Sequence, residues 1–166
     1  MVVVNYQIKK MNKWLKLVIS IAMCELVGIV GTPFTIAAIP SWYSTLNRPF
    51  FSPPNWLFAP VWTTLYLMMG IAFFLIWNQG FKKSKTKEAA HLFFIQLFLN
   101  GIWSPIFFGL KSPFLGLIVI ATLWGYLLDT INKFRALSKP AAYLLYPYFG
   151  WVSFATLLNA AIVILN

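Results

Sequence analysis

Aromatic rings recur at helical spacing in three segments of the sequence, each time beside an amide or a hydroxyl group. Residues three or four apart share one face of a helix, so each set forms a stripe. The stripes are Phe58, Trp62 and Tyr66; then Gln96, Asn100, Trp103 and Ser104; then Tyr148, Trp151, Phe154, Ala155, Leu158 and Asn159. Such stripes can line an aromatic cavity dotted with polar groups, or they can pack as the core of a helix bundle.

The residues of conventional catalysis are scarce. The chain has three acidic side chains, Glu25, Glu88 and Asp129, and one histidine, His91. We expect Glu88 and His91 at a solvated helix start, and Asp129 has the i, i+4 spacing of a surface pair with Lys133. Neither pair indicates acid–base catalysis, and no metal site is predicted. Because an indole is oxidisable, tryptophan is the residue type that could take part in a reaction.

The composition and the hydropathy pattern indicate a membrane protein. Hydrophobic residues make up 60% of the chain and charged residues 10%, whereas soluble domains carry about a quarter charged residues. About 20 apolar residues are needed to cross a bilayer core as a helix. We predict an all-α membrane protein with a single transmembrane domain over residues 1–166, a bundle of five transmembrane helices with a structured outer loop at 40–55. The helices are expected at about 15–39, 56–77, 92–110, 114–134 and 141–165.

The net charge of +10 is explained by topology rather than by nucleic-acid binding. With the N-terminus inside, eleven basic residues fall on the inner side and two, Arg48 and Lys111, on the outer side, as the positive-inside rule expects. The basic N-terminal stretch is then an uncleaved first span rather than a signal peptide, whose apolar run would be shorter. We expect an integral protein of a prokaryotic plasma membrane, with the 40–55 loop outside. The inner basic residues are Lys9, Lys10, Lys13, Lys16, Lys82, Lys83, Lys85, Lys87, Lys133, Arg135 and Lys139.

Glu25 is unusual because it lies roughly ten residues into the first span. That depth is about 15 Å at the helical rise, where an acidic side chain costs about 2.5 to 3.5 kcal/mol on insertion scales. A protonated, hydrogen-bonded carboxyl group is therefore favoured over a bare anion. Two interpretations stay open: a contact with a proton or a ligand, or an interhelical hydrogen bond that holds the span in the bundle.

Small residues indicate where helices approach closely. Cys24, Gly28 and Gly31 share one face of the first span, which lets another helix come near. Gly101 and Gly109 form a further small pair in the third span. We predict that this second pair supports a contact in a homodimer.

Three motifs stand out by their length: residues 42–66, the "LNGIWSPIFF" of the third span and the "PYFGWVSFATLLN" of the fifth. They resemble the tryptophan-rich sensory protein family, also called the translocator protein or peripheral benzodiazepine receptor family, over about residues 20–160. The resemblance implies five transmembrane helices and an outer loop folded over a pocket for porphyrins and other flat hydrophobic molecules. The implied pocket residues are Trp42, Tyr43, Trp62, Tyr66, Asn100, Trp103, Ser104, Tyr148, Trp151, Phe154, Ala155 and Leu158.

The composition of the 40–55 loop agrees with the role that the resemblance implies. Pro49, Pro53 and Pro54 restrict its backbone, which lowers the entropy lost when the loop settles. Its aromatic side chains need an apolar surface beneath them. We predict that the loop is a lid; the alternative is that it lies in the headgroup layer and its aromatic residues serve as interfacial anchors.

The resemblance also implies a ligand and a role. The expected ligand is a porphyrin, either protoporphyrin IX or haem, bound without a covalent cofactor, and the expected role is tetrapyrrole or stress regulation. A first alternative is a light- and oxygen-dependent porphyrin-degrading activity that uses Trp62 and Trp151. A second alternative is a ligand transporter. The expected partners are the lipid bilayer, a porphyrin-type small molecule and a second copy of the chain.

Overall fold

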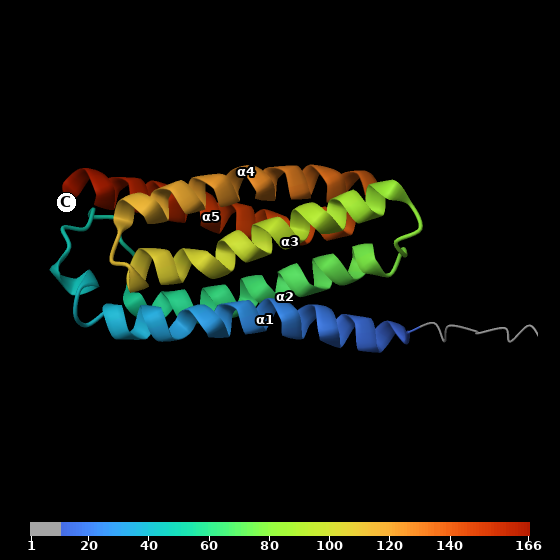
Figure 1. Ribbon diagram of the computed structural model, residues 1–166, viewed down its shortest axis with the longest axis horizontal. Coiled ribbons are helices and arrows are strands. Elements are labelled where there is room, and N and C mark those ends of the chain that lie inside the picture. The colour runs from blue at the N-terminus through green and yellow to red at the C-terminus, as the bar shows by residue number, and fades with distance from the viewer. Residues whose placement is uncertain (1–10) are drawn as a thin grey trace, which may run out of the picture.

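The computed structural model describes residues 11–166, which contain five long helices and no strand (Figure 1). All five are long and apolar enough to cross a membrane. The predicted all-α membrane fold is therefore confirmed. Lys9 and Lys10, which were counted among the inner basic residues, lie outside the described residues. The helices are α1 Lys13–Ala38, α2 Phe58–Trp77, α3 Ser84–Ser104, α4 Pro113–Leu137 and α5 Lys139–Leu165.

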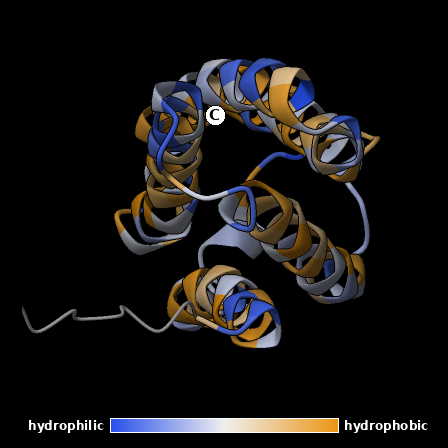
Figure 2. Cartoon of the chain, turned by 90° about the vertical axis from the view of Figure 1, so that its right-hand side faces the viewer, coloured by the Kyte–Doolittle hydropathy of each residue, from blue (hydrophilic) through white to orange (hydrophobic). Residues whose placement is uncertain are grey.

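The helices close into a ring. α1 packs against α2 and α3, α2 packs against α5, and α4 packs against both α5 and α3. The order round the bundle is therefore α1, α2, α5, α4, α3, which Figure 2 shows nearly end-on. Large apolar side chains such as Val18, Leu26 and Val30 are exposed on the outside of the bundle. An apolar outer surface of this kind suits a protein that is surrounded by lipid rather than water.

Capping hydrogen bonds, which a hydropathy pattern does not detect, determine where several of the helices begin. The side chain of Asn12 accepts a hydrogen bond from the backbone N–H of Trp14 at 3.1 Å, at the start of α1. Ser112 and Ser138 cap α4 and α5 in the same way. α3 begins at Ser84, ahead of the apolar segment expected from about residue 92. The difference arises because an apolar run marks the lipid-embedded part of a helix and not its polar first turns.

α3 ends in a π-helical turn, Pro105–Gly109. Proline lacks the backbone donor that the α-helical ladder needs, so the hydrogen-bond pattern changes at this point. The turn buries Phe107 and Phe108 against Tyr43 of the 40–55 loop. The segment between α1 and α2 contains two short 3-10 helices, Tyr43–Thr45 and Asn55–Leu57.

The predicted surface pair between Asp129 and Lys133 is not formed. The ammonium group of Lys133 instead lies 2.6 Å from a carboxylate oxygen of Glu88, a residue for which the sequence predicts only a solvated position. The cause is that α3 and α4 are packed neighbours, so that a residue on the next helix competes with one on the same helix. Both side chains are about half exposed, so the pair contributes little to stability.

Glycines bring α1 close to its two neighbours. Gly70 of α2 faces the backbone of Ile21, while Gly101 and Gly109 of the α3 segment face Val27 and Phe34 of α1. The two glycines predicted to support a homodimer therefore contact a helix of the same chain. A homodimer stays a prediction, without support from this pair.

The contact at Gly70 yields a prediction about stability. A Cβ atom on this residue would lie 2.5 Å from the Cα atom of Ile21, which is backbone and cannot rotate away. Overpacking of this kind costs about 1–3 kcal/mol. We expect Gly70→Ala to lower the unfolding temperature of the purified protein in detergent, measured by circular dichroism.

Two other helical glycines serve as matched controls. A Cβ atom on Gly125 or Gly150 would have no atom within 4 Å. Alanine at these positions should leave the unfolding temperature unchanged or raise it, because glycine in a helix costs about 0.5–1 kcal/mol relative to alanine. Equal unfolding temperatures for Gly70→Ala and the two controls would contradict the close packing of α1 on α2.

Candidate functional site

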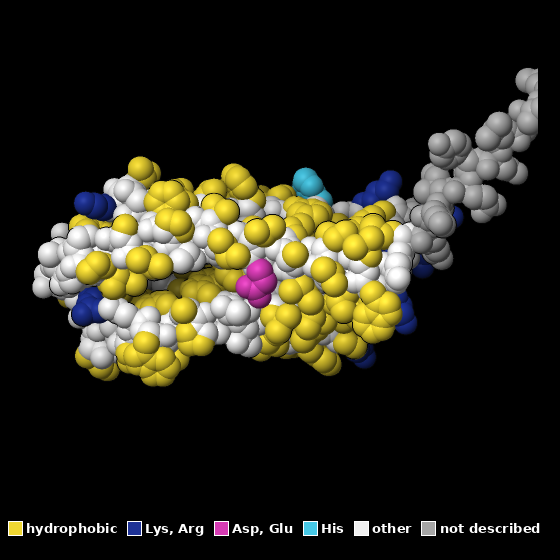
Figure 3. All heavy atoms as spheres, turned by 90° about the horizontal axis from the view of Figure 1, so that it is seen from below, with side chains coloured by type: hydrophobic (Ala, Val, Ile, Leu, Met, Phe, Trp, Pro, Cys, Tyr) yellow, Lys and Arg dark blue, Asp and Glu magenta, His cyan; other side chains and the backbone are white. Residues whose placement is uncertain are grey.

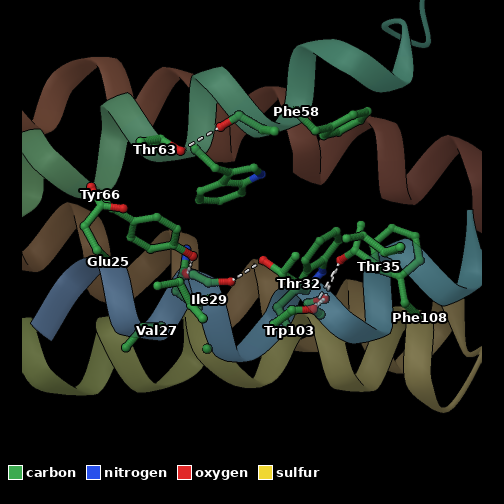
Figure 4. A pocket seen from close by; sticks show the side chains of 18 of the residues that line it. Glu25, Val27, Ile29, Thr32, Thr35, Phe58, Thr63, Tyr66, Trp103 and Phe108 are labelled. Atoms are coloured by element: carbon green, nitrogen blue, oxygen red, sulfur yellow. Dashed lines mark hydrogen bonds between the residues drawn. The ribbon is translucent and has the colours of Figure 1, made fainter. Parts of the chain in front are cut away.

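A cavity of about 350 Å³ lies between α1, α2 and α3, in the half of the bundle next to the 40–55 loop (Figure 4). Its volume is near the lower end of the range of about 300–1,000 Å³ that is usual for small-molecule pockets. Its lining along α1 extends from Glu25 to Ile39, a distance of about 21 Å at the helical rise. The cavity is therefore an elongated slot. The lining residues are Glu25, Val27, Gly28, Ile29, Gly31, Thr32, Thr35, Ile36, Ile39, Tyr43, Asn55, Phe58, Ala59, Trp62, Thr63, Tyr66, Asn100, Gly101, Trp103, Ser104 and Phe108.

The slot opens on the flank of the bundle. Figure 3 looks onto the side formed by α1 and α2 and shows a hollow there, bordered mainly by hydrophobic side chains. An acidic side chain lies at the edge of this hollow. Because the opening lies on the apolar flank of membrane-spanning helices, it faces the lipid.

Aromatic rings form two walls of the cavity. Trp62 stacks on Tyr66 with the ring centroids 5.5 Å apart and an angle of 28° between the planes. Trp103 borders the cavity and stacks at 5.1 Å and 22° on Phe107, which is buried behind it and outside the lining. Both geometries fall in the range for favourable aromatic pairs. The walls therefore offer flat apolar surfaces to a ligand.

A chain of buried hydrogen bonds stands behind the wall formed by Tyr66. The hydroxyl group of Tyr66 donates to Oδ1 of Asn100 at 2.5 Å, and Nδ2 of Asn100 donates to the hydroxyl oxygen of Tyr148 at 2.8 Å. These three residues belong to α2, α3 and α5. The chain fixes the relative positions of three helices and satisfies polar groups that lipid cannot satisfy.

A second set of hydrogen bonds joins α1 to α3. The hydroxyl group of Ser104 donates to the backbone carbonyl of Gly31 at 2.9 Å and lies 2.8 Å from the hydroxyl group of Thr35. Gly31 is buried, and a Cβ atom there would lie 3.2 Å from the Cβ atom of Ser104. The absence of a side chain at residue 31 thus lets the two helices meet beside the cavity.

The residues predicted from the fifth helix do not line the cavity. Tyr148 is fully buried behind Trp62, with their ring centroids 6.2 Å apart. Trp151 and Phe154 pack against Phe58 and Phe51, and neither borders the cavity. Ala155 and Leu158 lie among the packed residues of the bundle and also stay outside the lining. The reason is that Trp62 and Asn100 stand between the cavity and α5.

The predicted residues of the second and third helices do meet at the cavity. Trp62 and Tyr66 border it from α2, and Asn100, Trp103 and Ser104 border it from α3. Tyr43 borders it from the loop, whereas Trp42 packs on Phe107 at 5.6 Å and is not part of the lining. Their roles in ligand binding stay predictions.

The contribution of α1 was largely missed. Glu25, Gly28 and Gly31 drew attention in the sequence, but Ile29, Thr32, Thr35 and Ile36 did not, although all seven border the cavity. These residues are small or aliphatic and carry no aromatic signal. Thr32 and Thr35 each follow a glycine by one helical turn, and this repeat was the signal that could have indicated the cavity face of α1.

The 40–55 loop is held against the end of the bundle. Tyr43 is buried beside Phe108, and the guanidinium group of Arg48 lies 5.3 Å from the centre of the Tyr43 ring. Burial raises the pKa of the Tyr43 phenol, and the nearby Arg48 opposes that rise. Farther along, the backbone N–H of Asn47 donates to the side-chain oxygen of Asn166 at 3.0 Å, and the Asn166 amide donates back to the Asn47 carbonyl at 3.0 Å. The loop is thus fastened to both α3 and α5.

Comparison with known proteins identifies the family. The profile described as the TspO/MBR family matches residues 20–165, nearly the whole chain. The chain belongs to the TspO/MBR family. The resemblance found in the three sequence motifs is therefore confirmed.

Relatives within the TspO/MBR family come from bacteria, archaea and animals. The chain is 46% identical over 157 residues to a tryptophan-rich protein TspO of Chlorobaculum tepidum, covering 94% of this chain and 99% of that protein. It is 45% identical over 152 residues to a tryptophan-rich protein TspO of Archaeoglobus fulgidus, covering 92% and 97%. It is 38% identical over 132 residues to the translocator protein of Homo sapiens, covering 78% of each chain. The similarity thus extends over the five helices and the loop.

The hydrogen-bond chain centred on Asn100 yields a second prediction. Asn100→Leu would leave the buried hydroxyl groups of Tyr66 and Tyr148 without the partners they have now, at a cost of about 1–3 kcal/mol for each unpaired group. We expect the variant to unfold at a clearly lower temperature in detergent than the native protein.

The matched comparison removes all three polar groups together. Because apolar replacement of every partner is nearly neutral, Asn100→Leu combined with Tyr66→Phe and Tyr148→Phe should recover part of the lost unfolding temperature. A triple variant less stable than Asn100→Leu alone would show that the three residues do not act as one hydrogen-bonded unit.

Proposed function

We propose that the protein binds porphyrins and other flat hydrophobic molecules in the cavity between α1, α2 and α3. The observation that carries this proposal is the slot with its stacked walls, Trp62 on Tyr66 and Trp103 on Phe107, at membrane depth. A flat ring placed against Trp62 loses apolar surface to the protein and gains an aromatic contact of about 0.5–1.5 kcal/mol. Membership of the TspO/MBR family supports the same ligand class, and a role in tetrapyrrole or stress regulation is part of the proposal.

The open flank accommodates a ligand larger than the slot. A volume of about 350 Å³ suits one edge of a macrocycle better than the whole of it. The rest of the ring would extend between α1 and α2 into the lipid, where an apolar group is at no disadvantage. The carboxylates of a porphyrin would lie at the loop end, toward Arg48, which packs on the cavity residue Tyr43.

The 40–55 loop acts as a lid in this proposal. Two of its residues, Tyr43 and Asn55, border the cavity, so the loop closes the end of the slot. Its attachments to Phe108 and Asn166 hold it there. Access from the aqueous end is therefore restricted, and the flank facing the lipid is the route for a hydrophobic ligand.

Replacement of Trp62 tests the site. We expect Trp62→Leu to raise the dissociation constant for protoporphyrin IX roughly three- to tenfold, because the variant loses the stacking surface. The measurement is the shift of the Soret absorbance during titration of purified protein, made in the dark so that light-driven loss of the porphyrin does not contribute.

Trp124→Leu is the matched control. Trp124 lies on α4, packs on Phe149 and donates its indole N–H to Ser153 at 2.8 Å, away from the cavity. Its replacement should leave the dissociation constant unchanged. Equal affinities for the native protein and both variants would reject the cavity as the porphyrin site.

We further propose that the end of the bundle opposite the loop faces the cytoplasm, in the plasma membrane of a prokaryote. Nine of the eleven basic residues within 11–166 belong to that end, and Arg48 and Lys111 belong to the loop end. Lysine and arginine accumulate on the cytoplasmic side of membrane proteins. The bacterial and archaeal relatives support a prokaryotic membrane.

Cysteine labelling tests this orientation. In a Cys24→Ser background, we expect Ser44→Cys in the loop to react with a membrane-impermeant maleimide added to intact spheroplasts. Ser84→Cys, at the start of α3, should react only after the membrane is permeabilised. Both serines are exposed, so accessibility within the protein does not limit either reaction. The opposite labelling pattern would invert the proposed topology.

A further inference from the structure

The ionisable side chains that line the cavity, among the described residues, include an acid and no base. Its lining holds one carboxyl group, Glu25, and none of the lysine, arginine or histidine side chains within residues 11–166. The remaining lining residues are apolar, aromatic, amide or hydroxyl. The interior of the slot therefore presents an acidic group to a ligand and offers an anion no cationic partner.

Glu25 lies at the end of the slot that is farther from the loop. It is twelve residues into α1, about 18 Å from the first residue of the helix. An acidic side chain at such a depth is costly and rare in membrane helices, and it commonly marks a functional site. In Figure 4 its side chain lies beside Tyr66 at the margin of the cavity.

The hydroxyl group beside Glu25 is already engaged. Tyr66, whose side chain lies next to Glu25 in Figure 4, donates its hydroxyl hydrogen to Asn100. No hydrogen bond or ion pair involves the Glu25 carboxyl group within residues 11–166. The interhelical hydrogen bond, one of the two interpretations left open by the sequence, is thus not formed there, and the contact with a proton or a ligand is the interpretation that remains.

We propose that Glu25 is the counter-ion for a protonated amine and that the cavity accepts lipophilic amines with a flat aromatic body. This proposal rests on the proposed function only in treating the cavity as a ligand site. The aromatic body lies along Trp62 and Tyr66, and the nitrogen lies at the Glu25 carboxylate. A hydrogen bond between two charged groups is shorter and stronger than a neutral one, and a low-dielectric site strengthens it further.

The lateral opening fits this ligand class. An amine can reach the slot from the lipid in its uncharged form and take the proton from the carboxylic acid of Glu25, which leaves an ammonium and a carboxylate in contact. Neither partner then crosses hydrocarbon as an ion, and no further reactant is needed. A porphyrin would orient the other way, because its carboxylates find no cationic partner beside Glu25 and find Arg48 at the loop end.

Three pyrene probes with the same four-ring body test the proposal. They are 1-pyrenemethylamine, the neutral 1-pyrenemethanol and the anionic 1-pyrenecarboxylate, titrated into the full chain in a non-ionic detergent. Energy transfer from tryptophan to pyrene reports binding. We expect the amine to bind about tenfold more tightly than the alcohol, and the carboxylate to bind most weakly.

Replacement of the carboxyl group should remove the discrimination. We expect Glu25→Gln to weaken binding of the amine about tenfold and to change binding of the alcohol by less than about twofold. Asp129→Asn is the matched control, because it removes one carboxylate from an exposed position on α4 outside the cavity. It should leave all three affinities unchanged. This variant controls for the effect of the protein's net charge on the partition of the probes into the micelle.

Each result decides the proposal. Equal affinities of the native chain for amine and alcohol overturn it, even if Glu25→Gln cannot be purified. An equal loss for both probes in Glu25→Gln overturns it, because the carboxyl group would then act on packing and not on charge. Failure of all three probes to bind also overturns it. Selective binding of the amine without binding of protoporphyrin IX would support this inference and reject the porphyrin ligand.

Discussion

The hydrogen bonds of Asn100 constrain the rest of the bundle. Its amide joins Tyr66 of α2 to Tyr148 of α5 from a position on α3, so three helices meet at one buried polar residue. In lipid these groups have no water to pair with, and separating the helices would leave them unsatisfied. The arrangement of α2, α3 and α5 is therefore fixed, whereas α1, which also borders the cavity, takes no part in these hydrogen bonds.

α1 differs from the other helices in how little of it is buried. Of its most apolar stretch, 17% is buried, against 28–39% in the other four helices. Its contacts depend on small groups, with Gly31 against Ser104 and Gly70 against Ile21. Because α1 meets its neighbours at small residues and is the least buried of the five helices, room is left on its inner face. The cavity occupies that face, which explains why its opening is lateral.

The sequence predicted the helices better than it predicted their partners. Hydropathy located five spans, because a continuous apolar run is needed to cross the membrane whatever its neighbours are. The stripe of Phe58, Trp62 and Tyr66 does border the cavity, but the equally clear stripe on α5 packs behind it. Periodicity shows that a helix has a special face and does not show what that face meets. Lys133 illustrates the same limit, since its partner Glu88 lies on another helix and not one turn away.

At Gly28 the sequence indicated a small residue but not what the missing side chain makes room for. A Cβ atom there would collide with the ring of Tyr66. No aromatic or charged signal marks such a position, although the ring that stacks under Trp62 depends on it. The acidic group of the cavity stands one turn before this glycine, on the same helix. α1 therefore supplies both the room for the aromatic wall and the acidic group at its end, and in the proposed function these two features together select among flat molecules.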